Sequence, residues 1–156
     1  MKTPKTIGFP RMQKEAGERR AFLPDFIQYL ARLGASIHLE EGLGSRCGFT
    51  FDDYRQGNFA IHQCERQEAF RQDLVILLRS PSREEMKLIK PESTLVSMLH
   101  YPTRPARVAY LQQCGINAIS LDSIEDDYNR RLVENMKAVA WNGLEAAFDA
   151  LEKTWG

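Results

Sequence analysis

The sequence predicts an α/β protein with a Rossmann-like (flavodoxin-like), mostly parallel sheet and helices on both faces. Apolar, β-branched segments alternate along the chain with segments of helical periodicity, in the order β-α-β-α-β-α. One strand segment, residues 74–78, is a continuous apolar run, which is typical of a strand buried on both faces of a parallel sheet. Residues 94–99 are expected to form a second buried strand.

The first expected elements are a strand at Thr6–Phe9, a helix at Asp25–Leu33 and a strand at residues 35–39. The helix has apolar residues at helical spacing, with Pro24 at its start and Gly34 after its end. These are the usual positions of proline and glycine at the two ends of a helix, so the boundaries of this element are well marked.

Two capping signals mark the next helices. The hydroxyl of Thr50 can cap a short helix through Tyr54, and Ser82-Arg83-Glu84-Glu85 has the pattern of a capping box. A further helix is expected at residues 103–113, closed by Gly115, and a last strand at residues 116–121.

The last part of the chain differs from the rest. Tyr128–Lys153 contains no proline and a single glycine, Gly143, and its apolar residues follow the 3.6-residue period. This pattern predicts one long helix, or two in series broken near Gly143. We therefore expect a domain at residues 1–127 and a separate helical segment at residues 128–156.

The composition of the 156 residues excludes several classes of protein. The formal net charge is zero, which argues against a nucleic-acid surface, and no stretch approaches the roughly 20 apolar residues that span a bilayer. The N-terminus has no apolar run typical of a signal peptide. Three widely spaced cysteines without a C-x-x-C pair predict neither a disulfide framework nor a metal site. These features favour a soluble, cytoplasmic protein.

A glycine-rich loop follows the second predicted strand. Gly42-Leu43-Gly44-Ser45-Arg46-Cys47-Gly48 is close to the G-x-G-x-x-G phosphate loop, but its third glycine is one residue late. No acidic residue ends a following strand where a ribose would need one. We therefore expect a surface loop with positive φ angles, and no cofactor-binding residues in this chain.

Polar residues follow three of the predicted strands, at the strand ends where open parallel sheets bind ligands. His100 follows residues 94–99 and can hydrogen-bond a carbonyl or exchange a proton. Arg79 follows residues 74–78, and its planar guanidinium suits a carboxylate. The first strand is followed by a basic stretch that contains Arg11, Lys14, Arg19 and Arg20. Each has a plainer alternative, namely a core or capping histidine, a strand-end cation facing water and a solvated basic loop.

Several ordered motifs carry a resemblance to a known family. The segments are Gly8-Phe9-Pro10-Arg11-Met12, Arg19-Arg20-Ala21-Phe22-Leu23-Pro24, the stretch from Gly42 to Tyr54, Gln72-Asp73-Leu74 through Arg79-Ser80-Pro81, and Met98-Leu99-His100. In this order they resemble the N-terminal domain of the alanine dehydrogenase and pyridine nucleotide transhydrogenase family, which includes saccharopine dehydrogenases. The resemblance covers residues 6–121 and extends more loosely through the last helix.

The resemblance implies that residues 1–127 are a substrate-binding domain with a site for a 2-oxo or 2-amino acid, and that residues 128–156 are a connecting helix. Matched residue by residue, the family's substrate arginine is Arg19 and its histidine is His100, while Arg79 stands where the family has a lysine. An arginine can hold a carboxylate, but it is a poor proton donor because it stays protonated. The resemblance implies His100 and Arg79 as the catalytic candidates. It implies Arg19, Arg79 and His100 as the substrate-binding candidates.

The resemblance further implies an NAD(P)-dependent amino-acid dehydrogenase. The hydride would come from NAD or NADP bound mainly by a second domain that follows the connecting helix, so we expect this chain alone to lack turnover. The expected partners are a small 2-oxo or 2-amino acid, that nucleotide domain of the same full-length protein, and further copies in a homo-oligomer. An alternative is a non-catalytic binding or assembly domain, or a transhydrogenase-type domain that kept the fold without the amino-acid chemistry.

Overall fold

The computed structural model describes residues 6–12, 21–57, 59–133 and 136–155. By their internal contacts the residues divide into two compact units, Met1–Leu121 and Asp122–Gly156. Each unit is described separately below.

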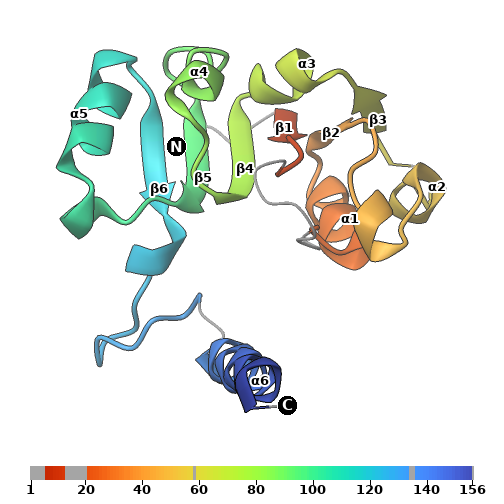
Figure 1. Ribbon diagram of the computed structural model, residues 1–156. Coiled ribbons are helices and arrows are strands. Elements are labelled where there is room, and N and C mark those ends of the chain that lie inside the picture. The colour runs from red at the N-terminus through yellow and green to blue at the C-terminus, as the bar shows by residue number, and fades with distance from the viewer. Residues whose placement is uncertain (1–5, 13–20, 58, 134–135, 156) are drawn as a thin grey trace. The chain divides into compact units, whose positions relative to one another are not determined.

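The first unit contains a six-stranded parallel sheet in the order β3-β2-β1-β4-β5-β6, which is the Rossmann-like α/β fold that the sequence predicts (Figure 1). The chain builds outward in one direction from β1 and then returns to build outward from β4. The sheet therefore has a topological switch point between β1 and β4, where ligands bind in folds of this kind. The strands are β1 (Thr6–Phe9), β2 (Ser36–Glu40), β3 (Ile61–Cys64), β4 (Leu74–Arg79), β5 (Thr94–Met98) and β6 (Asn117–Ser120).

The five strands expected from the sequence are all present, within a residue or two at their ends. The sequence did not reveal β3. This strand has only four residues, and its two central side chains, His62 and Gln63, are exposed at the edge of the sheet. It lacks both the apolar run and the alternation that identify longer strands.

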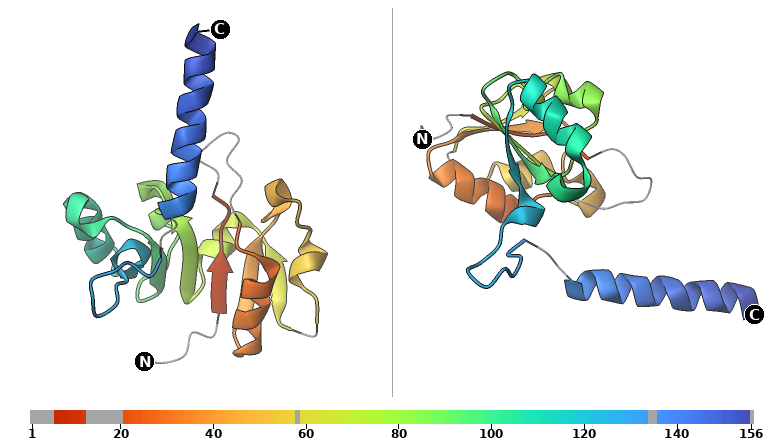
Figure 2. Two further views of the ribbon diagram at one scale, coloured as in Figure 1. Left: turned by 90° about the horizontal axis from the view of Figure 1, so that it is seen from below. Right: turned by 90° about the vertical axis from the view of Figure 1, so that its left-hand side faces the viewer.

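Helices cover both faces of the sheet. Figures 1 and 2 show α1 (Pro24–Arg32) and α2 (Phe51–Tyr54) on one side, with α3 (Arg66–Phe70) and α4 (Arg83–Met86) on the other. The helix α5 (Pro105–Gln113) packs on the side of α3, because its Leu111 belongs to the same apolar cluster as Phe70.

The central strand β4 supplies both cores. Val75 and Leu77 pack in the cluster beneath α3, α4 and α5, while Ile76 packs in the cluster beneath α1 and α2. Successive side chains of a strand point to opposite faces, so a continuous apolar run is what a doubly covered strand requires. This explains the 74–78 segment that first indicated a parallel sheet.

Gly8 brings α3 close to β1. A Cβ atom at Gly8 would lie 1.8 Å from the backbone oxygen of Ala69, far inside contact distance. The absence of a side chain therefore allows the short helix α3, with Arg66 at its start, to lie directly on the strand.

Both capping signals form as expected. The Thr50 hydroxyl accepts from the Asp53 N–H at 3.4 Å, and the Ser82 hydroxyl accepts from the Glu85 N–H at 3.3 Å. In return, the carboxylates of Asp53 and Glu85 accept from the backbone N–H of Thr50 and Ser82 respectively, each at 2.6 Å.

The second unit contains one helix, α6 (Met136–Trp155), among its described residues. The expected start at Tyr128 is wrong, since residues 126–130 form a turn in which the Asp126 carboxylate accepts from the N–H groups of Tyr128 and Arg130, both at 2.9 Å. Asn129 has a left-handed φ of 59°. These local bonds compete with a helix. Of the two alternatives for this segment, the single helix forms, because α6 runs through Gly143 without a break.

Apolar side chains recur along α6 at alternating spacings of three and four residues. Trp141, Leu144, Phe148 and Leu151 are each more than half exposed. Within the described residues, no helix combines the length and the apolar character needed to cross a membrane.

Candidate functional site

Arg79 and His100 come together at the carboxyl ends of β4 and β5. Arg79 is the last residue of β4 and pairs in register with Met98, the last residue of β5, so His100 follows two residues beyond that pair. Both side chains line a cavity of about 420 Å³, with Leu78, Ser80, Met98, Arg104 and Arg107. The strand order makes β4 and β5 neighbours, and this is why residues 21 positions apart share one cavity.

The backbone at His100 is unusual. Its φ of 53° is left-handed, which is uncommon for a residue with a side chain. The turn is fixed by the carbonyl of His100, which accepts from the N–H of Thr103 at 3.1 Å and from its hydroxyl at 3.3 Å. Strained residues of this kind are concentrated at binding sites, where they direct a side chain that the regular chain path would place elsewhere.

Two further arginines belong to this cavity and were not singled out in the sequence. Arg107 lies in the first turn of α5 and donates from Nη1 to the backbone oxygen of Leu99 at 2.8 Å. Arg104 is the N-cap residue of the same helix and is exposed. Their signal was their position in the loop and first helical turn after a buried strand, where ligand contacts are common in this fold.

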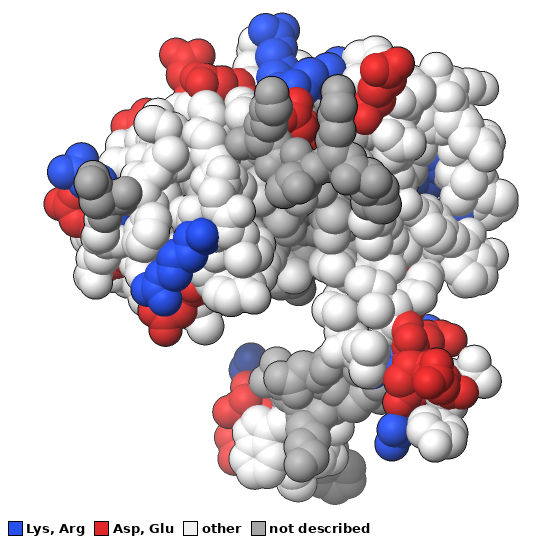
Figure 3. Space-filling model, turned by 180° about the vertical axis from the view of Figure 1, so that it is seen from behind, with Lys and Arg blue, Asp and Glu red and all other residues white. Residues whose placement is uncertain are grey.

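The charge of the cavity is one-sided. Three guanidinium groups and one imidazole line it, and its described lining includes no aspartate or glutamate. On the face shown in Figure 3, basic and acidic side chains lie next to one another. A concave region lined by several guanidinium groups favours an anionic ligand.

The first-strand loop is described at both ends but not at residues 13–20. Arg19, Lys14 and Arg20 lie outside the described residues. Arg11 is described, and its side chain donates from Nη1 to the backbone oxygen of Glu41 at 3.1 Å.

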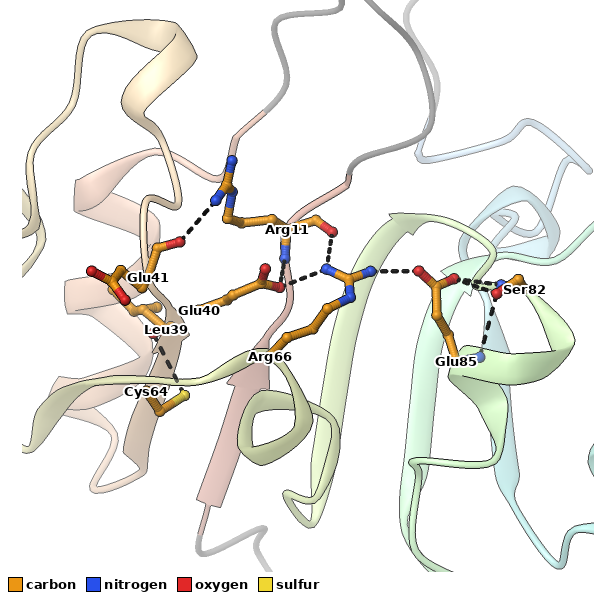
Figure 4. Close-up of polar contacts among 8 residues, drawn as sticks. All are labelled: Arg11, Leu39, Glu40, Glu41, Cys64, Arg66, Ser82 and Glu85. Atoms are coloured by element: carbon orange, nitrogen blue, oxygen red, sulfur yellow. Dashed lines mark hydrogen bonds and ion pairs between the residues drawn. The ribbon is translucent and has the colours of Figure 1, made fainter.

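A buried ion-pair network surrounds Arg11 (Figure 4). The carboxylate of Glu40, whose side chain is 6% exposed, accepts from the Arg11 backbone N–H and from Arg66 Nη1, both at 2.7 Å. Arg66 Nη1 also donates to the Arg11 backbone oxygen at 3.0 Å. Both backbone groups of Arg11 are thus held where the chain leaves β1.

Arg66 also forms an ion pair on the other side of the switch point. Arg66 pairs through Nη2 with the carboxylate of Glu85 on α4, and its guanidinium lies 5.3 Å from the ring centre of Phe70. Burial raises the pKa of Glu85, but the Ser82 hydrogen bonds and Arg66 lower it more, so the net pKa lies below its usual range. This network joins the two halves of the sheet, and the guanidinium of Arg66 is bound to carboxylates within it.

The glycine-rich loop has the geometry expected from its sequence. Gly42, Gly44 and Gly48 have φ angles between 78° and 85°. A Cβ atom at Gly44 would lie 2.2 Å from the hydroxyl of Tyr54, which donates to the Phe22 backbone oxygen at 2.9 Å. The loop therefore packs against buried structure.

The cavity lies at the carboxyl ends of the central strands of a doubly wound α/β domain, where domains of this class bind their ligands. The family model described as "Alanine dehydrogenase/PNT, N-terminal domain" matches residues 8–140. The chain belongs to this family.

The chain is similar to known proteins both in sequence and in structure. Alanine dehydrogenase 1 of Staphylococcus aureus is 27% identical over 127 residues, which cover 81% of this chain and 34% of that protein. A solved L-alanine dehydrogenase has a TM-score of 0.70 at 21% identity, covering 80% of this chain and 34% of its own. A transhydrogenase from Sinorhizobium meliloti has a TM-score of 0.66 at 15% identity, covering 75% of this chain and 35% of its own. The chain thus spans about a third of the length of these relatives.

Proposed function

We propose that this chain is the substrate-binding part of an NAD(P)-dependent amino-acid dehydrogenase and that it binds a 2-oxo or 2-amino acid. The observation that carries the proposal is that Arg79 and His100 line one cavity at the carboxyl ends of neighbouring strands. The resemblance in sequence places His100 and Arg19 at the family's histidine and arginine, and Arg79 at the position of its lysine.

Each residue has a distinct role in this proposal. Arg79 and Arg19 bind the substrate carboxylate, which fixes the direction of the C2 carbon. His100 hydrogen-bonds the 2-oxo oxygen and stabilises the negative charge that develops there during reduction. Because arginine stays protonated, we assign the transferable proton to His100 and not to Arg79.

The hydride donor in this proposal is NAD or NADP, bound mainly by a domain outside this chain. Two facts support this division. The relatives are about three times as long as the chain, and the glycine-rich loop at residues 42–48 packs on Tyr54 instead of opening a helix directly after its strand. The connecting segment, residues 128–156, would lead from the substrate domain of residues 1–127 to that nucleotide domain.

Ligand titration and an activity assay test the proposal together. We expect pyruvate or 2-oxoglutarate to bind the chain in calorimetry, and we expect Arg19→Ala to weaken binding about tenfold or more, by loss of a charged hydrogen bond. Equal affinity in Arg19→Ala would remove Arg19 from the site. NAD-dependent reduction of either acid by the chain alone would contradict the division into two domains.

Arg79 supports a second candidate function, a non-catalytic or transhydrogenase-type domain. The family's lysine is replaced at this position, and the transhydrogenase structure shares the fold. The Arg79→Lys variant of the full-length protein separates the two functions. A large gain in amino-acid oxidation would mean that the natural protein had given up this chemistry, whereas unchanged or reduced activity would favour the dehydrogenase.

The assembly and location of the protein are part of the proposal. The apolar residues of α6 at three- and four-residue spacing support a homo-oligomer of the full-length protein, since this spacing is the one by which helices pair. Light scattering after size exclusion measures the number of copies directly. We place the protein in the cytoplasm, where thiols such as that of Cys47 stay reduced.

A further inference from the structure

We infer that Glu85 and Arg66 are positioning residues for ligand binding in the cavity at the carboxyl ends of β4 and β5. The described lining of that cavity contains neither residue, so they act without touching the ligand. They act through the turn at residues 80–82, which follows β4, and so help to set the direction in which the Arg79 side chain leaves the strand. This inference rests on the proposed function and adds to it two residues outside the motifs that carry the family resemblance.

The end of β4 is irregular where it presents Arg79. The strand pairs in regular register with β5 up to Ile76, and the register then shifts before Arg79 pairs with Met98. The regular ladder alone therefore does not fix the direction of the Arg79 side chain, and the turn that follows contributes to it. This turn is also part of the cavity wall, since Ser80, the next residue, lines the cavity together with Arg79.

Glu85 holds this turn from α4. One oxygen of its carboxylate, Oε2, accepts from the Ser82 backbone N–H at 2.6 Å and from the Ser82 hydroxyl at 2.9 Å. The other oxygen, Oε1, pairs with Nη2 of Arg66. Both oxygens are thus in use, and Arg66 fixes the orientation of the carboxylate that holds Ser82 (Figure 4).

Arg66 is itself firmly held on the β1 side of the sheet. Its Nη1 donates to the nearly buried carboxylate of Glu40 at 2.7 Å and to the backbone oxygen of Arg11 at 3.0 Å. Its helix, α3, lies directly on β1 at Gly8, where a Cβ atom would have no room. A binding group is held accurately when the residues behind it are locked by packing and hydrogen bonds, and Arg66 meets this condition. The position of β1 is thereby transmitted through Arg66 and Glu85 to the turn beside the cavity.

A double-mutant cycle with pyruvate as the probe tests the inference. Glu85→Gln keeps the shape of the side chain, but its amide has one acceptor oxygen where the carboxylate uses two, so the bond to Ser82 or the bond to Arg66 is lost. We expect NMR titration of the chain to give roughly tenfold weaker binding of pyruvate in Glu85→Gln, because the binding group is displaced. In the Arg79→Gln background the same change should alter the affinity less than about twofold, since Glu85 acts through Arg79.

A control and a second variant accompany Glu85→Gln. Glu84→Gln is the matched control, because this neighbouring glutamate on α4 is exposed and pairs with Lys87, and it should leave the affinity for pyruvate unchanged. Arg66→Lys keeps a positive charge beside Glu40, but one ammonium group cannot replace the two Nη atoms that bind Glu40 and Glu85 separately. We expect the same roughly tenfold loss of affinity in Arg66→Lys, and again little loss in the Arg79→Gln background. This variant also serves if thermal unfolding shows that Glu85→Gln does not fold.

The outcomes separate this inference from the proposed function. An unchanged affinity for pyruvate in both Glu85→Gln and Arg66→Lys overturns the positioning role and leaves the 2-oxo acid site intact. An equal loss of affinity with and without Arg79 also overturns it, because a general structural effect does not depend on that side chain. Failure of pyruvate to bind the original chain overturns the proposed function and this inference together.

Discussion

The two halves of the sheet use their cations differently at the carboxyl edge. Beside β1 and β2, Arg66 is bound to Glu40 and Glu85, and the Arg11 side chain is bound to a backbone carbonyl. Beside β4 and β5, Arg79, Arg104 and Arg107 line the cavity that also contains His100, and its described lining holds no carboxylate. The first set stabilises the fold and the second favours an anionic ligand, although sequence composition alone counts all of them equally.

The largest expected effect comes from breaking the ion pair between Arg66 and Glu40. Arg66→Met removes the cation from the nearly buried carboxylate of Glu40, and breaking a buried pair in this way costs about 3–5 kcal/mol. Urea unfolding measures the free energy of unfolding directly. Arg104→Gln, at the exposed N-cap of α5, should change the free energy of unfolding by less than about 0.5 kcal/mol. Similar losses in the two variants would contradict the distinction between the two sides.

The next effect comes from the packing of α3, which carries Arg66, on β1. Gly8→Ala places a methyl group against the Ala69 carbonyl, so α3 must move away from β1 and carry Arg66 with it. We expect a loss of about 3 kcal/mol in the free energy of unfolding. The matched control is Gly143→Ala in α6, where an added Cβ meets no atom within 4 Å and where alanine favours the helix. A Gly8→Ala protein as stable as the original would mean that α3 adapts without cost.

At the cavity, Arg79→Gln should weaken ligand binding and change the free energy of unfolding little. Loss of a hydrogen bond to a charged group costs about 1.5–3 kcal/mol, so the affinity for pyruvate should fall roughly 10- to 100-fold. Because Arg79 is exposed, the free energy of unfolding should stay within about 0.5 kcal/mol. A calorimetric titration beside a urea curve gives both values, and a large loss of stability without a loss of affinity would assign Arg79 a structural role.

The smallest effect is a change with pH. The pKa of Glu85 lies below its ordinary value of 4.5 in the folded state. Its stabilising contribution is therefore fully present above pH 4.5 and is lost as the pH falls through the folded pKa. Glu85→Gln should lower stability at neutral pH and flatten the curve below pH 4.5. A variant with an unchanged slope in this window would exclude Glu85 as a source of the acid sensitivity.

The parts of the molecule differ in how well the sequence predicts them. The continuous run at 74–78 and the Ser82–Glu85 capping box depend on local chemistry, and both form as expected. The pairing of Arg66 with Glu40 joins residues 26 positions apart and depends on strand order, which no local pattern contains. Arg104 and Arg107 were missed for the same reason, since only the packing of α5 brings them beside Arg79.

The second unit shows the opposite failure. Helical periodicity extends back to Tyr128, but Asp126 binds two backbone N–H groups and forms a turn instead. A single side chain thus outweighed the periodic pattern, because its hydrogen bonds form over four residues with little loss of entropy.

The left-handed backbone at His100 lowers the stability of the fold, while the imidazole of the same residue lines the cavity. A residue with a Cβ pays about 1 kcal/mol or more to adopt this conformation, while glycine adopts it freely. His100→Gly should therefore give a protein at least as resistant to unfolding as the original, with no imidazole in its cavity. Selection for robustness alone would favour the glycine at this position, so a screen for thermostable variants of this domain is expected to discard the histidine.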